Sequence, residues 1–568
     1  MKKRLIIVAV AIVAIIVLAY FAFGRKVVDK YTYGTDKADL AEFFGVSENE
    51  ASIIYQNAKT ADKAIVNNGV CYLSLENIEG YFGKGFYYSE AYNGGTLMYT
   101  TSQGTYETVL GSNEYTYAGE KGNYDYPITI SDMGKIYVAA EFARKFFSFS
   151  YAVYDMHVQI VTDSWTYTEM EITGNTQIRV AGGIKSEILR DVEKGEKVEL
   201  LDEMENWSKV MTSDSYIGYI ENKKMEKLSQ VATPAPAAVE LPAFEDISIG
   251  KTVCLGFHAI GGVGGNDTIY EMVAEGTGMN VIAPTWFSMN DNEGNLRNFG
   301  TSNYVNIAHG MGLQVWGVVD NFNYALDNNK DIDEYEVLSD TNKRRNLEIN
   351  IVNAAVNLNL DGINLDFEGL SSDCGPHYGQ FIKELSVLTH AQGIILSVDN
   401  YVPFAYNEHY RIDVQGEYAD YVLIMGYDEH YHGSGDPGSV ASFDYVANGL
   451  DKTLEYAAPE KIINALPFYT IVWKNESGKI TDSYLILANQ SSYLSKIGVS
   501  YSWDESTCQN YAEWTSGGVT YQLWLEDEES ITAKLNAMKA RDIGGVAVWR
   551  LGYGTSSVWN LVKLYTES

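Results

Sequence analysis

The stretch 361–368, Asp-Gly-Ile-Asn-Leu-Asp-Phe-Glu, alternates apolar and polar side chains and constrains the fold more than any other segment. In a strand, successive side chains point to opposite faces, so one face is apolar and the other carries Asn364, Asp366 and Glu368. Two carboxylates held side by side repel, which a fold tolerates mainly where their pKa values serve acid–base chemistry. The stretch therefore predicts a strand with catalytic carboxylates at its end.

Seven further apolar, β-branched segments in the C-terminal half are typical of buried strands. Most are separated by segments long enough for a helix, as parallel strands require. The pattern predicts a (β/α)₈ barrel over residues 245–568, with an active site at the C-terminal ends of its strands. The eight expected strands are 252–260, 280–289, 313–320, 361–368, 393–401, 419–428, 461–469 and 544–552.

The octapeptide resembles the catalytic strand of glycoside hydrolase family 18, the chitinase-like group, whose pattern is Asp-Gly-x-Asp-x-Asp-x-Glu. Asn364 departs from this pattern, and the departure is similar to the branch of bacterial spore-cortex and cell-wall N-acetylglucosaminidases. Three other strand ends also resemble family motifs. They are Met-Gly-Tyr-Asp at 425–428, Leu-Pro-Phe-Tyr at 466–469 and Val-Trp-Arg-Leu-Gly at 548–552.

The resemblance implies a mechanism in which the 2-acetamido group of the substrate is the nucleophile, a stated exception among glycosidases. Glu368 would be the acid and then the base, Asp366 would orient the acetamido group, and Tyr427 would donate a hydrogen bond to its oxygen. Substrate-binding roles are expected for Asp361, Asn364, Met425, Asp428, Tyr469 and Trp549.

Asn364 is expected to lie on the cleft face and to hydrogen-bond Asp366. Neither a metal nor a cofactor is implied, since the segment Asp-Glu-His-Tyr-His at 428–432 lacks the helical histidine spacing of a zinc protease.

The N-terminus carries Lys2, Lys3 and Arg4 before an uncharged, mostly aliphatic run over residues 5–23. This length is close to the roughly 20 residues that span a bilayer, and the preceding charges favour a cytoplasmic N-terminus. The sequence therefore predicts a membrane anchor within residues 1–26 and an extracellular catalytic domain. A cleaved signal peptide and a secreted enzyme are the alternative.

Three segments lie between the expected anchor and the barrel. Residues 229–244 are rich in proline and alanine and predict a semi-rigid linker. Residues 157–228, with Gly-Glu-Lys-Val at 195–198 and Trp-Ser-Lys-Val at 207–210, resemble a bacterial SH3-like domain, which would bind the cell wall or serve as a spacer. Residues 31–155 show two strand-then-helix units, at 72–78 and 137–143, and weakly resemble the N-terminal domain of copper amine oxidases, without histidines to bind copper.

The net charge of −34 and the isoelectric point near 4.6 argue against nucleic acid as a partner. The expected protein is a membrane-anchored extracellular glycosidase that cleaves β-linked N-acetylglucosamine glycan, with peptidoglycan as the favoured polymer. The alternatives are a chitinase, an endo-β-N-acetylglucosaminidase acting on glycoprotein glycans, and a sugar-binding wall protein without activity.

Overall fold

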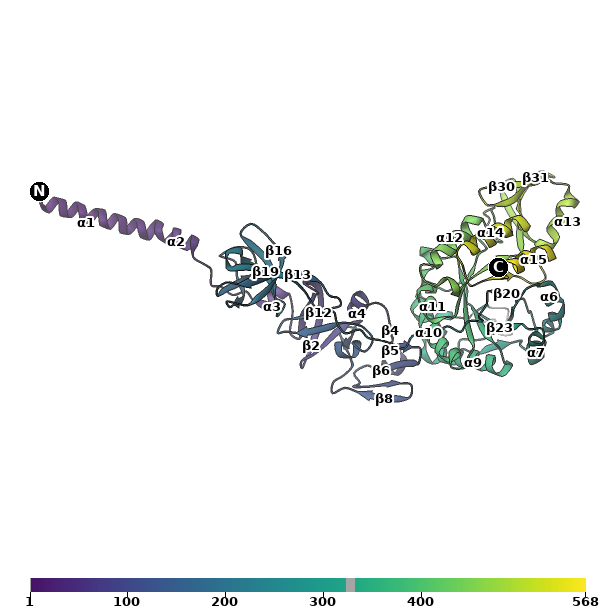
Figure 1. The fold of residues 1–568 in the computed structure, drawn as a ribbon, viewed down its shortest axis with the longest axis horizontal. Helices are drawn as coiled ribbons and strands as arrows, with labels where there is room; N and C mark the ends of the chain where they lie inside the picture. The colour runs from purple at the N-terminus through teal and green to yellow at the C-terminus, as the bar shows by residue number, and fades with distance from the viewer. Residues whose placement is uncertain (1, 323–331, 568) are drawn as a thin grey trace. The chain divides into compact units, whose positions relative to one another are not determined.

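The structure is a computed structural model that describes residues 2–322 and 332–567. It contains two compact units, which we call the N-terminal unit and the barrel unit (Figure 1). The barrel unit comprises Pro242–Ser568 together with two segments from the expected accessory domain, Tyr87–Glu107 and Thr116–Glu120. The barrel unit is therefore discontinuous in sequence, whereas the sequence predicted a continuous domain over residues 245–568.

The barrel unit is built on eight parallel strands that close into a ring through the pairing of β20 with β21. The predicted (β/α)₈ barrel is confirmed, and each expected strand contains one observed strand. In chain order these are β20 (Val253–His258), β21 (Val281–Met289), β23 (Gln314–Asp320), β24 (Gly362–Asp366), β25 (Ile395–Tyr401), β26 (Tyr421–Met425), β27 (Ile462–Pro467) and β33 (Gly545–Trp549).

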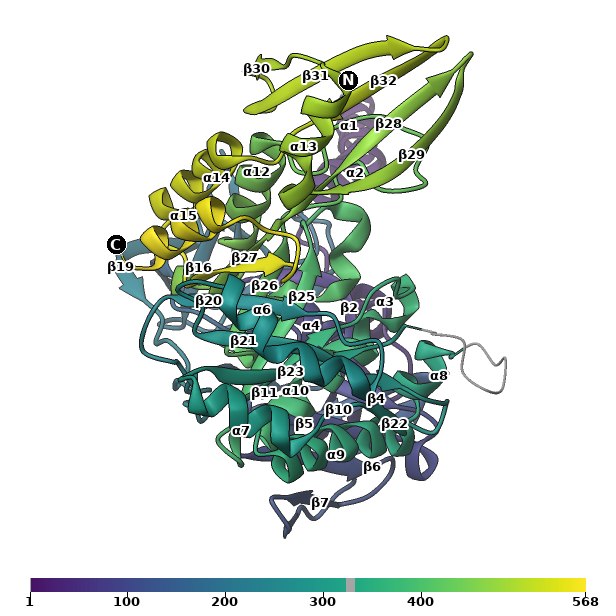
Figure 2. The same cartoon turned by 90° about the vertical axis from the view of Figure 1, so that its right-hand side faces the viewer.

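Helices surround the barrel, and a separate sheet stands at one end of it (Figure 2). The helices are α6 (Ile269–Glu275), α7 (Ser302–Gly310), α8 (Glu334–Ser339), α9 (Thr341–Leu358), α10 (Gly375–His390), α11 (Ile412–Tyr418), α12 (Phe443–Thr453), α14 (Glu528–Ala540) and α15 (Ser556–Thr566). The separate sheet has β28 (Tyr469–Glu476), β29 (Lys479–Ile486), β30 (Ser502–Asp504), β31 (Gln509–Ser516) and β32 (Val519–Trp524), with α13 (Leu487–Ile497) beside it, and β22 (Leu296–Asn298) pairs with β21.

Local sequence signals place the strand β24 between α9 and α10. Asp340 caps the start of α9 by accepting hydrogen bonds from two backbone N–H groups, and Asn359 ends the helix in the left-handed conformation. The next strand opens at Gly362, where an added Cβ would lie 2.7 Å from a ring carbon of Trp316. Only glycine fits there, which explains the Asp-Gly pair that precedes the alternating residues.

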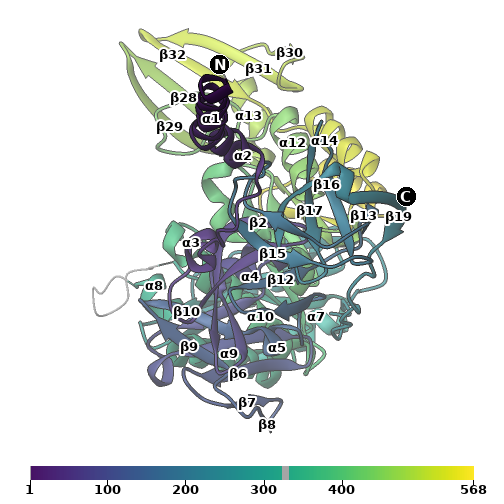
Figure 3. The same ribbon diagram turned by 90° about the vertical axis from the view of Figure 1, so that its left-hand side faces the viewer.

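The N-terminal unit contains two sheets, whose strands are seen in Figure 3. The first, in spatial order, has β11 (Ser150–Val153), β12 (His157–Val161), β1 (Glu50–Tyr55), β2 (Ala58–Asn67), β3 (Val70–Ser74), β10 (Lys135–Ala139) and β9 (Thr129–Asp132), with α3 (Leu40–Phe44), α4 (Leu75–Phe82) and α5 (Ala140–Ala143). The second has β15 (Ile188–Val192), β14 (Thr176–Arg179), β18 (Ile217–Glu221), β17 (Trp207–Thr212), β16 (Lys197–Asp202), β13 (Thr166–Ile172) and β19 (Met225–Ala232).

The SH3-like domain corresponds to the second sheet, but its expected first strand does not belong to it. β12 pairs with β1 and β11 in the first sheet, and the second sheet begins at β13. The two strand-then-helix units expected upstream are present as β3 with α4 and β10 with α5.

The N-terminal helix does not support the predicted membrane anchor. α1 (Lys2–Ala19) begins with three charged residues, so its uncharged part spans residues 5–19, short of the roughly 20 residues that a membrane requires. A π-helical turn (Tyr20–Gly24) and the charged helix α2 (Arg25–Tyr31) follow. Within the described residues, none of the helices is both long and apolar enough to cross a membrane.

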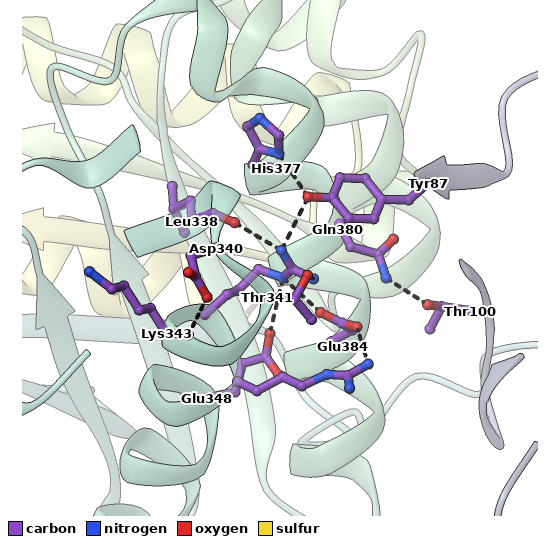
Figure 4. A network of polar contacts seen from close by, with 12 residues as sticks. Tyr87, Thr100, Leu338, Asp340, Thr341, Lys343, Glu348, His377, Gln380 and Glu384 are labelled. Carbon is purple, nitrogen blue, oxygen red and sulfur yellow. Dashed lines mark hydrogen bonds and ion pairs between the residues drawn. The ribbon is translucent and has the colours of Figure 1, made fainter. Parts of the chain in front are cut away.

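The segment 87–107, which we call the ribbon, packs on the helices that flank the strand β24. It lies within a small sheet of β4 (Phe86–Ser89), β5 (Thr96–Thr101), β6 (Gly104–Val109), β7 (Glu114–Tyr117) and β8 (Glu120–Asn123). Arg344 of α9 donates to Glu384 of α10 at 2.8 Å and to the Tyr87 hydroxyl of the ribbon at 3.2 Å (Figure 4). Gln380 of α10 reaches Thr100 of the ribbon at 3.0 Å. The ribbon is thus joined to both helices through buried polar side chains.

Candidate active site

A cavity of about 320 Å³ opens at the C-terminal ends of the barrel strands. It is lined by carboxyl groups and aromatic rings contributed by six of the barrel strands, their following loops and the separate sheet. The lining residues are Phe257, Phe322, Asp366, Glu368, Asp399, Tyr401, Met425, Tyr427, Asp428, Tyr469, Tyr484, Trp549, Arg550 and Tyr553. Seven of the nine residues expected from the sequence are brought together here.

Glu368 follows the strand β24 and is held from two sides. Its backbone N–H donates to Oδ1 of Asn321 at 2.8 Å, and Nδ2 of the same asparagine donates to its carbonyl oxygen at 2.8 Å. The Tyr401 hydroxyl donates to Oε2 of the carboxyl group at 2.7 Å. Burial raises the pKa of Glu368, Tyr401 opposes this rise, and Asp428 and Asp320 add to it. A carboxyl with a raised pKa is suited to deliver a proton.

Asp366 is buried at the end of β24, with only 7% of its surface exposed. Burial raises the pKa of Asp366 well above its ordinary value, and Asp399, Glu368 and Asp320 raise it further. The three neighbouring groups that raise the pKa of Asp366 are all carboxyls. The aspartate next along the barrel, Asp399 of β25, is 2% exposed, and burial and Glu368 also raise its pKa.

Asn364 does not have the partner expected from the sequence. Its Nδ2 donates to Oδ1 of Asp399 at 2.7 Å and to Oγ of Ser397 at 3.2 Å. The side chain of Asn364 is fully buried. Ser397 is its partner on the neighbouring strand β25. Asn364 therefore lies beneath the cavity rather than on its wall.

Asp361 is a second correction. It precedes β24 at the N-terminal end of that strand, and its carboxylate accepts from the Val315 N–H at 2.8 Å and is 2.8 Å from Nε2 of His309. The C-terminal ends of parallel strands meet at the other end of the barrel, so this carboxylate cannot reach the sugar. Its role in the structure is to hold the start of two neighbouring strands.

Tyr427 and Asp428 extend the cavity from the end of β26. Burial raises the pKa of Tyr427 well above its ordinary value, and nearby carboxyl groups raise it further, so the hydroxyl remains a hydrogen-bond donor. Asp428 adopts the left-handed backbone conformation at φ 61°, which is uncommon outside glycine and concentrates at functional sites. The Tyr469 hydroxyl donates to the carboxyl group of Asp428.

Aromatic rings form the apolar part of the cavity. Trp549 ends β33, and Phe257 lies on the paired strand β20. The centres of their rings are 5.5 Å apart. Tyr469 contacts Tyr484 of the separate sheet edge to face, with ring centres 5.5 Å apart. Aromatic faces of this kind match the CH surfaces of a sugar ring.

Several lining residues were not assigned from the sequence. Asp399 and Tyr401 alternate on the expected strand 393–401 and end at the same rim as Glu368, so the rule for barrel active sites could have identified them. Arg550 directly follows Trp549 and could have been included with it. Tyr484 lies on β29 of the separate sheet, and no local signal connected it to the cavity.

A parallel barrel with a carboxyl of raised pKa beside buried acids and a tryptophan defines a glycoside hydrolase of the barrel type. Residues 327–554 match the family model of glycosyl hydrolases family 18, and residues 174–225 match that of the bacterial SH3 domain. The barrel region therefore matches glycosyl hydrolases family 18, and the second sheet of the N-terminal unit matches the bacterial SH3 domain.

Two named bacterial relatives match about half of the chain or less. The uncharacterized glycosylase YvbX of Bacillus subtilis (strain 168) is 25% identical over 308 residues, which are 51% of this chain and 86% of that protein. The cortical fragment-lytic enzyme of Bacillus anthracis is 24% identical over 40% of this chain, and the matched region spans 54% of that enzyme.

The solved structure of the Bacillus cereus spore cortex-lytic enzyme SleL is similar in fold, with a TM-score of 0.50 and 19% identity over 62% of this chain and 78% of the other. The C-terminal domain of a putative chitinase from Desulfitobacterium hafniense DCB-2 also gives a TM-score of 0.50, with 17% identity over 56% of this chain and 100% of the other.

Proposed function

We propose that this glycosidase hydrolyses β-linked N-acetylglucosamine glycan, with peptidoglycan as the polymer, and that it retains the configuration at the cleaved carbon. The observation that carries the proposal is the position of Glu368. It is the carboxyl at the rim of the cavity that follows β24, it is held by Tyr401 and Asn321, and its pKa is raised. Asp366 and Tyr427 lie in the same cavity, each less than a tenth exposed.

The proposed first step protonates the glycosidic oxygen. Glu368 donates its proton to the leaving oxygen while the carbonyl oxygen of the substrate's 2-acetamido group attacks the anomeric carbon. Asp366 accepts a hydrogen bond from the acetamido N–H, and its negative charge balances the oxazolinium that forms. Tyr427 donates to the acetamido oxygen.

The second step returns the enzyme to its starting state. The Glu368 carboxylate removes a proton from a water molecule, and the resulting hydroxide opens the oxazolinium at the anomeric carbon. Two inversions leave the product in the β-configuration. Glu368 is again protonated, so the step balances without a metal or another cofactor as reactant.

Two features support peptidoglycan as the polymer. Relatives are named cortical fragment-lytic enzymes, and a bacterial SH3 domain accompanies the barrel and is a candidate for attachment to the cell wall. Chitin is the second candidate, because the fold is also shared with a putative chitinase. Glycoprotein glycans with the same linkage are the third.

The test uses the full chain with purified sacculi, chitin oligomers and an N-glycosylated glycoprotein in parallel. We expect new N-acetylglucosamine reducing ends from sacculi by mass spectrometry, β-anomeric products by NMR before mutarotation, and no cleavage of N-deacetylated glycan. A thiazoline that mimics the oxazolinium should inhibit. Release of the α-anomer first, or equal cleavage after deacetylation, would contradict the mechanism.

We also propose that the enzyme works outside the cytoplasm, where its polymer lies. The support is the positively charged start of the chain followed by the apolar residues 5–23. Fractionation of cells that express the full chain, with an antibody against the barrel, should find the protein outside the cytoplasmic fraction. Recovery in the cytoplasm alone would contradict the proposal.

A further inference from the structure

Asp399 is a buried carboxyl in the active-site cavity for which the proposed mechanism has no role. It lies on β25, next to the strand that carries Asp366, and both residues line the cavity. Only 2% of its surface is exposed, so it does not present a face to a bound sugar. Its carboxyl group accepts a hydrogen bond from Asn364, whose Nδ2 lies 2.7 Å from Oδ1 of Asp399.

This group of side chains contains buried acceptors that the N–H groups of Asn364 do not reach. Both N–H groups of the Asn364 amide are used, one on Asp399 and one on Ser397. Oδ1 of Asn364 and Oδ1 of Asp366 are buried acceptors without a partner among the described residues. Ionised carboxylates supply acceptors only, whereas a protonated carboxyl supplies a donor. A proton on one of the two aspartates supplies such a donor from within the pair.

The surrounding charges point the same way. Glu368, Asp320 and the hydroxyls of Tyr378 and Tyr427 act on the two aspartates, and none of these groups is a cation. The guanidinium of Arg550 lines the same cavity. Two carboxylates in one buried site cannot both ionise without a large penalty. One proton and one negative charge distributed over the pair is the arrangement that this environment favours.

We propose that Asp399 is a positioning residue that shares one proton with Asp366 across strands β24 and β25, with Asn364 as the fixed bridge that orients it. This inference rests on the proposed function, because it concerns the state of Asp366 when the acetamido group arrives. When the sugar binds, the proton resides on Asp399, and Asp366 is the carboxylate that accepts the acetamido N–H. The proton moves between the two carboxyls and none is gained or lost.

The hydrogen bond between Asn364 and Asp399 can be tested by exchanging the two residues. Asn364 and Asp399 are hydrogen-bonded to each other, so the double variant Asn364→Asp with Asp399→Asn keeps one amide and one carboxyl at the pair. Asp399→Asn alone removes the carboxyl, and Asn364→Asp alone adds one. Only the double variant therefore has the same number of carboxyls at positions 364 and 399 as the unaltered enzyme.

We expect Asp399→Asn to lower kcat about 10-fold to 100-fold, in the range of coupled residues in one network, while KM stays within a few-fold. In the double variant, the decrease in log kcat should be no more than half of the decrease seen in Asp399→Asn. The pH profile of kcat should change shape in Asp399→Asn and return toward that of the unaltered enzyme in the double variant. A residue that merely supports the fold would not show this recovery.

The measurement uses the full chain and a soluble N-acetylglucosamine oligomer, with circular dichroism to follow folding. Unchanged kcat and pH profile in Asp399→Asn would overturn the inference, and so would a double variant that is unfolded or no faster than the single one. Failure of the proposed function looks different, since the unaltered enzyme would then cleave no such glycan or Glu368→Gln would remain active.

Discussion

Two groups of buried carboxyls in the barrel unit have opposite electrostatic surroundings. On the outer side, Glu384 of α10 is 6% exposed, and Arg344 and Arg345 lie 2.8 Å and 3.3 Å from its oxygens. Burial alone raises the pKa of Glu384, but the two arginines lower it, and the net direction is downward. In the cavity, Asp366 is equally buried and is surrounded by carboxyls, so its pKa rises.

The difference shows that burial does not decide what a carboxyl does. With two arginines beside it, Glu384 has a lowered pKa and stays ionised. Glu348, which lies 3.8 Å from Arg344, has a raised pKa because of burial and the charge of Glu384. In the cavity, the pKa of Asp366 is raised, which suits a carboxyl that takes part in acid–base chemistry. The strand β24 lies between the helices of the first group and ends in the second, so the two groups can be perturbed separately.

The largest effect is expected where the titrating proton itself is removed. Glu368→Gln keeps the shape of the side chain but has no carboxyl proton to deliver, so kcat should fall by about 10² to 10⁴. Sugar binding and thermal unfolding should change little. Turnover of a soluble oligomer is the measurement, with Glu408→Gln at an exposed position as the matched control. Turnover within a few-fold of the unaltered enzyme would remove Glu368 from the acid role.

The second prediction concerns the stability that the buried ion pairs of Arg344 contribute. Arg344→Leu leaves Glu384 and Glu348 buried with one cation fewer, and breaking a buried pair in this way costs about 3–5 kcal/mol of unfolding free energy. Arg541→Leu is the matched control, because its ion pair with Asp451 is part-exposed and should matter less. Denaturant unfolding of the full chain, followed by tryptophan fluorescence, measures both. Equal stability of the two variants would show that the buried pair carries no special weight.

The third prediction concerns Asp320, at the end of β23, whose pKa burial raises from 3.8 to about 6. A carboxyl with a raised folded-state pKa stabilises the fold below its unfolded pKa, and this contribution is lost as pH rises through about 6. The difference corresponds to about 3 kcal/mol. Asp320→Asn cannot ionise and does not lose this contribution. The difference in unfolding free energy between Asp320→Asn and the unaltered enzyme should therefore shift in favour of the variant as the pH rises from about 4 to about 7. Parallel urea-unfolding curves at both pH values would contradict the assignment.

The smallest effect is a shift in the pH profile. The hydrogen bond from Tyr401 lowers the pKa of Glu368, so Tyr401→Phe should raise that pKa. The acid must be protonated to act, and activity is lost as pH rises through its pKa, so the alkaline limb of kcat should move to higher pH. A pH–rate series on both proteins measures this, with Tyr456→Phe at an exposed position as the control. A shift to lower pH would mean that Tyr401 stabilises the protonated form.

The sequence predicted the barrel because each strand is a continuous apolar segment bounded by turns, and it predicted the cavity because the motif residues lie at strand ends. It misplaced Asp361 because the resembled motif includes this aspartate, although as the first residue of the stretch it lies at the end of the strand away from the active site. The sequence predicted a hydrogen bond from Asn364 to Asp366, because residues close together on one strand can be recognised in a sequence. The observed partner, Asp399, lies on the neighbouring strand. Contacts between residues far apart in the chain, such as Tyr87 with Arg344, have no local signal at all.

The ribbon also sets an order of events during synthesis. Tyr87 leaves the ribosome 257 residues before Arg344, its partner on α9. At the usual elongation rate of about 5–20 residues per second, the ribbon is exposed for roughly 10–50 s before the helix that covers it exists. During that interval its strands present open edges to other chains. We expect that chaperones or low expression temperature will improve the yield of the full chain, and that a truncated gene starting at the linker will give a barrel with bare helices.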